Sequence, residues 1–159
     1  MYLDALSFLE DERDAWRPYE QLMQLSDDQL ERPVEGAHGW SGRDLIVHLL
    51  VWLDISLATA RELAVGETSP TMARMDAAWD ERADAVNDEL HAAWADVPLA
   101  EVRQRFESIP GELRGYLTVV PETRWVKHPT HLESFFGETI EHYEDHRADL
   151  EAILESARA

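Results

Sequence analysis

The chain has 159 residues, and its net charge excludes some classes of binding partner. Its 33 Asp and Glu outnumber its 14 Lys and Arg, which gives a formal net charge of −19 with histidine neutral. Such an excess repels phosphate backbones and anionic lipid, so we expect neither a nucleic-acid partner nor a membrane surface. Hydrophobic residues form 45% of the chain, so the acidity does not indicate disorder.

Cysteine is absent, which excludes disulfides, thiolate metal ligands and a cysteine nucleophile. Any bound metal must therefore be held by His, Asp or Glu. The first residues are acidic where a signal peptide carries base, and no apolar run is long enough to span a membrane, so we expect a cytoplasmic location. The length predicts a single domain over residues 1–159.

The first half of the chain predicts two long helices. Apolar residues recur at helical spacing through residues 3–24, with an expected buried set of Leu6, Leu9, Trp16, Tyr19 and Leu22 or Met23. Pro18 lies inside this stretch and predicts a kink or a break. After a short turn at 26–28 and a loop at 36–39, Ser41 and Asp44 match a capping box that opens a helix to about residue 64.

The second half predicts three more helical stretches. A linker at 67–71 precedes a helix over about 72–94, and a further helix runs from 98 to about 119, where Pro110 can bend or split it. The last helix is expected over about 132–157. With no convincing strand and no repeat, the pattern indicates an all-α fold, a four-helix bundle with extra short helical segments.

Three histidines are the candidate metal ligands. His142 and His146 are four residues apart in the last predicted helix, which places their Cβ atoms roughly 5–6 Å apart on one face. That face continues the apolar line of residues 135–139, and His48 lies one turn from Leu45 in the second long helix. Buried imidazoles each need a hydrogen-bond partner or an ion, and one shared metal satisfies all three.

Other readings of these histidines remain open. The pair can be a solvated feature of an acidic helix, and all three can be metal-free core histidines, in which case chelators leave stability unchanged. The motif is not that of a zincin, because no Glu directly follows His142. Glu138, Glu141 or Asp145 can orient the ligands or supply a fourth one.

The remaining candidates are aromatic, basic and histidine side chains. Trp52, Trp79 and Trp94 are at helical positions typical of a core, whereas Trp40 and Trp125 are in predicted loops and are the better pocket candidates. The candidate substrate pocket comprises Trp40, Trp52, Trp125 and Glu138. His38, His128 and His131 can rim the site, and His91 has no identifiable partner. Arg43, Arg124, Lys127 and Arg147 are the basic residues near the two histidine motifs.

The two histidine motifs resemble those of the DinB/YfiT-like superfamily of metal-binding four-helix bundles. The resemblance rests on Gly39-Trp40-Ser41-Gly42-Arg43-Asp44-Leu45-Ile46-Val47-His48-Leu49 and on His142-Tyr143-Glu144-Asp145-His146-Arg147-Ala148-Asp149-Leu150. It implies that His48, His142 and His146 bind a divalent metal, with nickel or zinc as frequent occupants. It also implies a low-molecular-weight thiol as cosubstrate and a homodimer. The first motif further resembles the branch that contains the colibactin self-protection protein.

Two functional hypotheses follow. The first is a metal-dependent enzyme that acts on a small electrophilic molecule, by thiol transfer or by hydrolysis, since a bound metal lowers the pKa of a thiol or of water. The second is a non-enzymatic bundle that binds a small molecule in a stress or self-protection role, with incidental metal or none. Turnover separates the two, because a binder protects only stoichiometrically.

Overall fold

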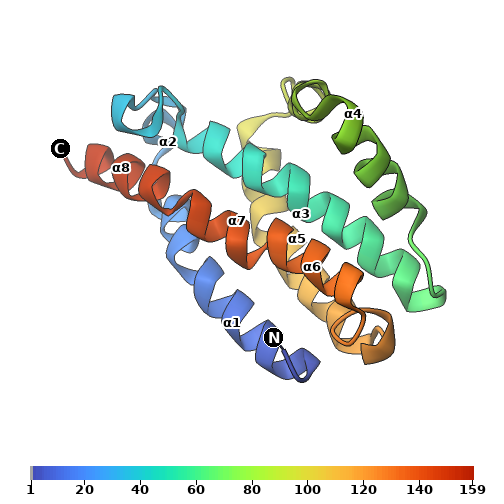
Figure 1. Cartoon of the computed structure of the whole chain (residues 1–159). Helices are drawn as coiled ribbons and strands as arrows, with labels where there is room; N and C mark the ends of the chain where they lie inside the picture. The colour runs from blue at the N-terminus through green and yellow to red at the C-terminus, as the bar shows by residue number, and fades with distance from the viewer. Residues whose placement is uncertain (1) are drawn as a thin grey trace.

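Residues 2–159 are described by a computed structural model, and over these residues the chain is helical without a strand (Figure 1). In chain order the elements are α1 (Ala5–Trp16), the 3-10 helix η1 (Arg17–Gln24), α2 (Asp27–Glu31), η2 (Glu35–Ala37), α3 (Gly42–Val65), α4 (Pro70–Ala92), α5 (Leu99–Val119), η3 (Glu122–Arg124), α6 (Pro129–Glu138), α7 (Ile140–Asp145) and α8 (Arg147–Arg158). The predicted all-α bundle with short extra helices is confirmed.

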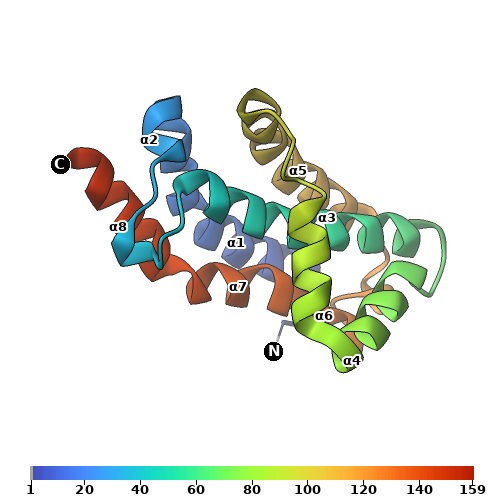
Figure 2. The same cartoon turned by 90° about the horizontal axis from the view of Figure 1, so that it is seen from above.

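The central helix of the bundle is α3, which contacts α4, α5, α6 and α8. Figure 1 shows α1, α3, α5 and the line formed by α6 to α8 packed lengthwise. Helix α4 lies outside these four and packs mainly on α3, and it bends at Arg82, where the backbone is non-helical (Figure 2). Within residues 2–159, no helix combines the length and apolar character that crossing a membrane would require.

The capping box predicted at the start of the second long helix is present. The backbone N–H of Asp44 donates to Ser41 Oγ at 3.1 Å, and that of Ser41 donates to Asp44 Oδ2 at 2.9 Å. These two bonds satisfy donors that an open helix end would leave unpaired. They fix the first turn of α3 and therefore the position along the helix axis from which the side chain of His48 projects.

The buried face of the first helix differs from the expected one. Leu6 is 65% exposed and Leu9 is only half-buried, whereas α1 buries Phe8, Glu12 and Trp16. Trp16, Tyr19 and Leu22 of the expected set are buried, so the prediction is confirmed for these three residues and wrong for Leu6. The predicted break near Pro18 is confirmed, because the α-helix ends at Trp16 and continues as the 3-10 helix η1.

The last helix is interrupted twice, which the apolar pattern did not predict. Backbone angles leave the helical region at Thr139 (φ −117°, ψ −97°) and become irregular at His146 (φ −100°, ψ 8°). The buried hydroxyl of Thr139 donates a hydrogen bond to the carbonyl of Phe135 at 2.6 Å, so this carbonyl accepts from a side chain at the break. Single-residue interruptions preserve the spacing of apolar residues, so periodicity does not detect them.

Two smaller expectations concern α4 and α5. Helix α4 begins at Pro70, with Ser69 as its N-cap, and it ends at Ala92, close to the predicted 72–94. Pro110 does not split α5, since the helix continues through it from Leu99 to Val119.

Candidate metal centre

The structure brings together the three histidines that the sequence singles out. His48 comes from α3, His142 from α7, and His146 is the residue that joins α7 to α8. One side-chain nitrogen from each lies within 4.8 Å of the others, and Nε2 of His142 is 2.9 Å from Nε2 of His48. Two nitrogens bound to one ion at about 2.0–2.1 Å are separated by about 3 Å, so this spacing suits a shared metal.

The break at His146 does not disturb the pairing of the two histidines on the last helical line. The backbone N–H of His146 still donates to the carbonyl of His142 at 3.2 Å, so the turn between them is kept. The short helix α7 therefore carries one ligand near its start and presents the other at its end. Its direction is set by the breaks on either side.

Two of the three histidines have a second partner on the nitrogen away from the cluster. Nδ1 of His146 is 2.9 Å from Oδ2 of the buried Asp149, and Nδ1 of His48 is 2.9 Å from Nε2 of His91. A partner on Nδ1 holds the proton there and leaves Nε2 free to bind an ion, an arrangement common to histidines in metal sites. Asp149 therefore takes the orienting role expected of Glu141 or Asp145, which are both exposed.

The structure supplies a partner for His91, which the sequence did not identify. His91 lies 43 residues from His48 along the chain and reaches it because α4 folds back along α3. The spacing of apolar residues within each helix does not show which residues of two different helices come into contact. The partnership of His146 with Asp149 is local, however, and the i, i+3 spacing of the two residues could have indicated it.

Burial keeps the imidazoles of His48 and His142 neutral. It lowers the pKa of His48 to about 3, with further lowering by the neighbouring histidines, and it lowers the pKa of His142 to about 4, with help from His146. Neutral imidazole is the form that binds a metal. Nδ1 of His142 is buried without a hydrogen-bond partner among residues 2–159. The donor set therefore fits a divalent ion held by three nitrogens.

The two loop tryptophans lie in different places from those expected. Trp40 packs on the cluster itself, with its ring stacked on His146 at 5.7 Å between centroids, and it does not line the adjoining cavity. Trp125 is wrong as a pocket residue, because it is fully buried and packs edge-on against Phe8 and Phe135. The loop after α5 turns into the core, where the indole fills the space between α1 and α6.

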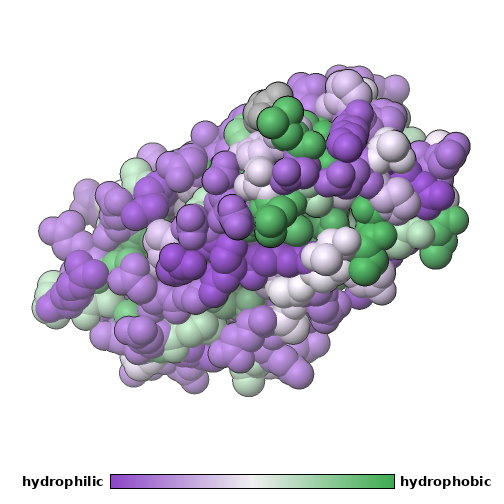
Figure 3. Space-filling view, turned by 90° about the horizontal axis from the view of Figure 1, so that it is seen from below, coloured by the Kyte–Doolittle hydropathy of each residue, from purple (hydrophilic) through white to green (hydrophobic). Residues whose placement is uncertain are grey.

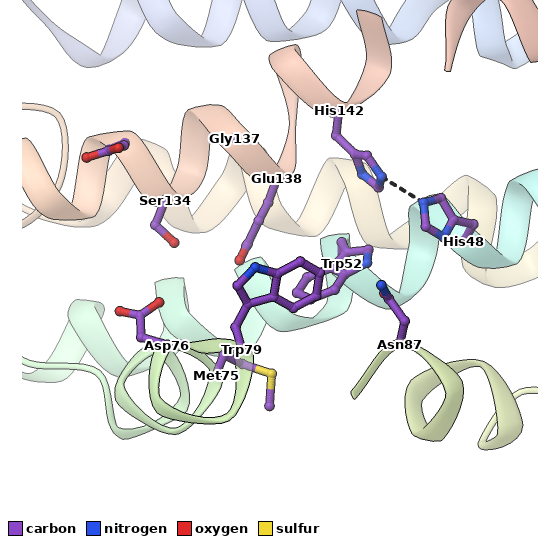
Figure 4. Close-up of a pocket in the computed structure, with 11 residues that line it drawn as sticks. His48, Trp52, Met75, Asp76, Trp79, Asn87, Ser134, Gly137, Glu138 and His142 are labelled. Carbon is purple, nitrogen blue, oxygen red and sulfur yellow. Dashed lines mark hydrogen bonds between the residues drawn. The ribbon is translucent and has the colours of Figure 1, made fainter. Parts of the chain in front are cut away.

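A cavity of about 410 Å³ adjoins the histidine cluster, with His48 and His142 in its wall (Figure 4). Trp52 lines it, as expected of a pocket candidate. Trp79 also lines it and is 44% exposed, so its assignment to the core is wrong. The two indoles meet edge-to-face at 5.4 Å. Trp94, the third tryptophan expected in the core, is buried there.

Glu138 lines the same cavity. Its carboxylate accepts a hydrogen bond from the hydroxyl of Ser56 on α3. Burial raises the pKa of Glu138 to about 7, although the bond from Ser56 acts in the opposite direction. At neutral pH this carboxyl therefore exchanges its proton readily, unlike an ordinary surface glutamate.

The other histidines do not rim the cavity. His38 is exposed and lies 3.6 Å from Asp149, on the side of that carboxylate opposite His146. His128 and His131 stack on each other at 3.7 Å at the start of α6, where His128 accepts from the backbone N–H of His131. These contacts give all three histidines local structural roles.

The basic residues near the motifs are also engaged elsewhere. Arg43 donates to the carbonyl of Val97, and Arg124 donates to that of Leu63 at 3.1 Å. Lys127 lies 3.4 Å from Glu122, and Arg147 lies 3.4 Å from Glu151. None of the four lines the cavity.

The family described as the mycothiol maleylpyruvate isomerase N-terminal domain matches residues 9–150. The chain belongs to this family. The family is part of the DinB/YfiT-like superfamily, so the resemblance read from the histidine motifs is confirmed. Neither the curated proteins nor the solved structures gave a match. The narrower resemblance to the colibactin self-protection branch stays a prediction.

Proposed function

We propose that this member of the mycothiol maleylpyruvate isomerase family is a metal-dependent enzyme that acts on a small electrophilic molecule. His48, His142 and His146 hold the divalent ion. The observation that carries the proposal is the convergence of three imidazoles beside a cavity large enough for a small molecule. Imidazole donors suit nickel and zinc, and three protein ligands leave open positions, as in catalytic sites.

The chemistry divides between the ion and the chain. A divalent ion in this position supplies a Lewis acid that lowers the pKa of a bound thiol or water. Asp149 and His91 hold the ligand rings in orientation, and Trp40 covers the cluster and excludes water. The family name favours a thiol of the mycothiol class as the nucleophile and a transfer or isomerisation rather than hydrolysis.

Elemental mass spectrometry on protein purified without a histidine tag tests the proposal first. We expect close to one nickel or zinc per chain in the unmodified protein and background metal in the His142→Ala/His146→Ala variant. The loaded protein should then turn over a thiol and an electrophile, and His48→Ala should abolish that turnover. Background metal, with no thermal shift on addition of zinc or nickel, would overturn the metalloenzyme proposal. Stoichiometric protection without turnover would favour the binding-protein alternative.

Asp149→Asn should weaken metal binding by roughly 10- to 100-fold, because the amide cannot hold the proton on Nδ1 of His146 as a carboxylate does. Competition with a chromogenic chelator measures the metal affinity of the variant and of the unmodified protein. His38→Ala is the matched control, since His38 approaches the same carboxylate from outside and should leave the affinity unchanged. Equal effects of the two variants would contradict the orienting role of Asp149.

Dimerisation stays a prediction. Figure 3 shows a face that is hydrophilic over most of its area, with apolar side chains in small separate groups. Within residues 2–159, the large apolar side chains that are exposed are those of Leu3, Leu6, Val65, Trp79 and Val119.

A further inference from the structure

The cavity beside the histidine cluster is lined by acidic groups without a compensating base. Asp76 on α4 and Glu133 and Glu138 on α6 contribute carboxyl groups. Among the described residues that line it, there is no Lys or Arg. Asp76 and Glu133 are exposed to solvent, whereas burial raises the pKa of Glu138 to about 7. The wall therefore presents a negative potential to whatever enters.

The acids and the histidines occupy different ends of this cavity. Figure 4 shows His48 and His142 at one end, Asp76 and Ser134 at the other, and Glu138 between them.

The aromatic walls add a second kind of recognition. Trp52 on α3 and Trp79 on α4 meet edge-to-face, and both line the cavity together with the thioether of Met75. Indole faces attract organic cations within about 6 Å, and the attraction adds to that of nearby carboxylates. Trp79 is 44% exposed, so part of its surface is available to a bound molecule.

We infer that the cavity selects a substrate with two unlike ends: an electrophilic centre that reaches the histidine cluster and, on an apolar stem, an ammonium or similar organic cation that lies among Asp76, Glu133 and the two indoles. The orientation of this molecule rests on the proposed function, because the ion defines the reactive end. Recognition of the cation does not depend on the ion.

A dicarboxylate is the substrate class that this cavity disfavours. An anionic group would face Asp76 and Glu133, and like charges this close repel. The four basic residues near the histidine motifs do not offset them, since each is engaged outside the cavity. Within its family, the chain is thus built for a cationic rather than an anionic electrophile.

Isothermal titration calorimetry of the full chain tests the inference with three probes: 4-phenylbutylamine, 4-phenylbutanol and 4-phenylbutyrate. The probes share a phenyl group on a short alkyl chain and differ in the charge of the terminal group. Each titration is made on chelator-treated and on zinc-loaded protein, because an ion attracts carboxylate by itself. In the chelator-treated protein, we expect the amine to bind at least about tenfold more tightly than the alcohol, a difference of about 1.4 kcal/mol. The carboxylate should bind more weakly than the alcohol.

Two double variants distinguish attraction of the amine by the carboxylates of the cavity from attraction by the overall negative charge of the protein. Asp76→Asn/Glu133→Gln should remove most of the preference for the amine over the alcohol. Asp96→Asn/Glu67→Gln makes the same change in net charge at two exposed acids outside the cavity, and it should keep the preference. Carboxylate binding as tight as amine binding in the chelator-treated protein, or equal losses in the two double variants, would overturn the inference. Metal content is measured separately, so failure of the metalloenzyme proposal is distinguishable from failure of this one.

Discussion

Replacing Glu12 with alanine is expected to lower the free energy of unfolding by about 3–5 kcal/mol, the cost of breaking a buried charge pair. Glu12 is 1% exposed, and its carboxylate accepts from Nε of Arg114 at 2.5 Å and from the hydroxyl of Tyr143 at 2.9 Å. The alanine variant leaves both donors without an acceptor. Because these residues lie on α1, α5 and α7, the loss loosens the helix that carries His142.

Chemical denaturation at pH 7 measures this effect. Glu10→Ala changes an exposed acid of the same helix and should alter the free energy of unfolding by no more than about 0.5 kcal/mol. A loss below about 1 kcal/mol in the Glu12 variant would show that the network is not a main tie between the helices. Metal affinity of the folded variant should also fall, since Tyr143 directly follows His142.

Acidification should destabilise the metal-free protein through its histidine cluster. Burial, with the neighbouring His146, lowers the pKa of His142 from 6.5 to about 4, so the folded state binds fewer protons than the unfolded state between these values. Stability from this group is fully present above pH 6.5 and is lost as the pH falls toward 4. One pKa unit corresponds to about 1.4 kcal/mol, so His142 alone contributes on the order of 3 kcal/mol.

The comparison of unfolding free energies at pH 7.5 and pH 4.5 isolates this effect. His142→Gln should show a smaller loss than the unmodified protein over that interval, because glutamine does not titrate. Glu138 acts in the opposite direction, since its raised pKa favours the folded state as the pH falls from about 7. The difference between variant and parent removes that contribution. An unchanged pH dependence in the variant would contradict the burial of a neutral imidazole at this position.

Features that depend on neighbours along the chain follow from the amino-acid sequence without the fold. The start of α3 follows from Ser41 and Asp44, because a capping box needs only residues three apart. The break after Trp16 follows from Pro18, which has no backbone N–H to donate to the preceding turn. The histidine triad was also accessible, because the i, i+4 pair and the third histidine each lie near an apolar helix face.

Which side chains from different helices meet depends on how the helices pack. His91 reaches His48, Trp79 lines the cavity and Trp125 enters the core, because of how α4 and the loop after α5 pack on the bundle. Periodicity reports how apolar a face is, but it does not report which helix covers that face or leaves it open. The acidic wall of the cavity has the same origin, since Asp76 and Glu133 are ordinary surface acids until α4 and α6 bring them to one opening.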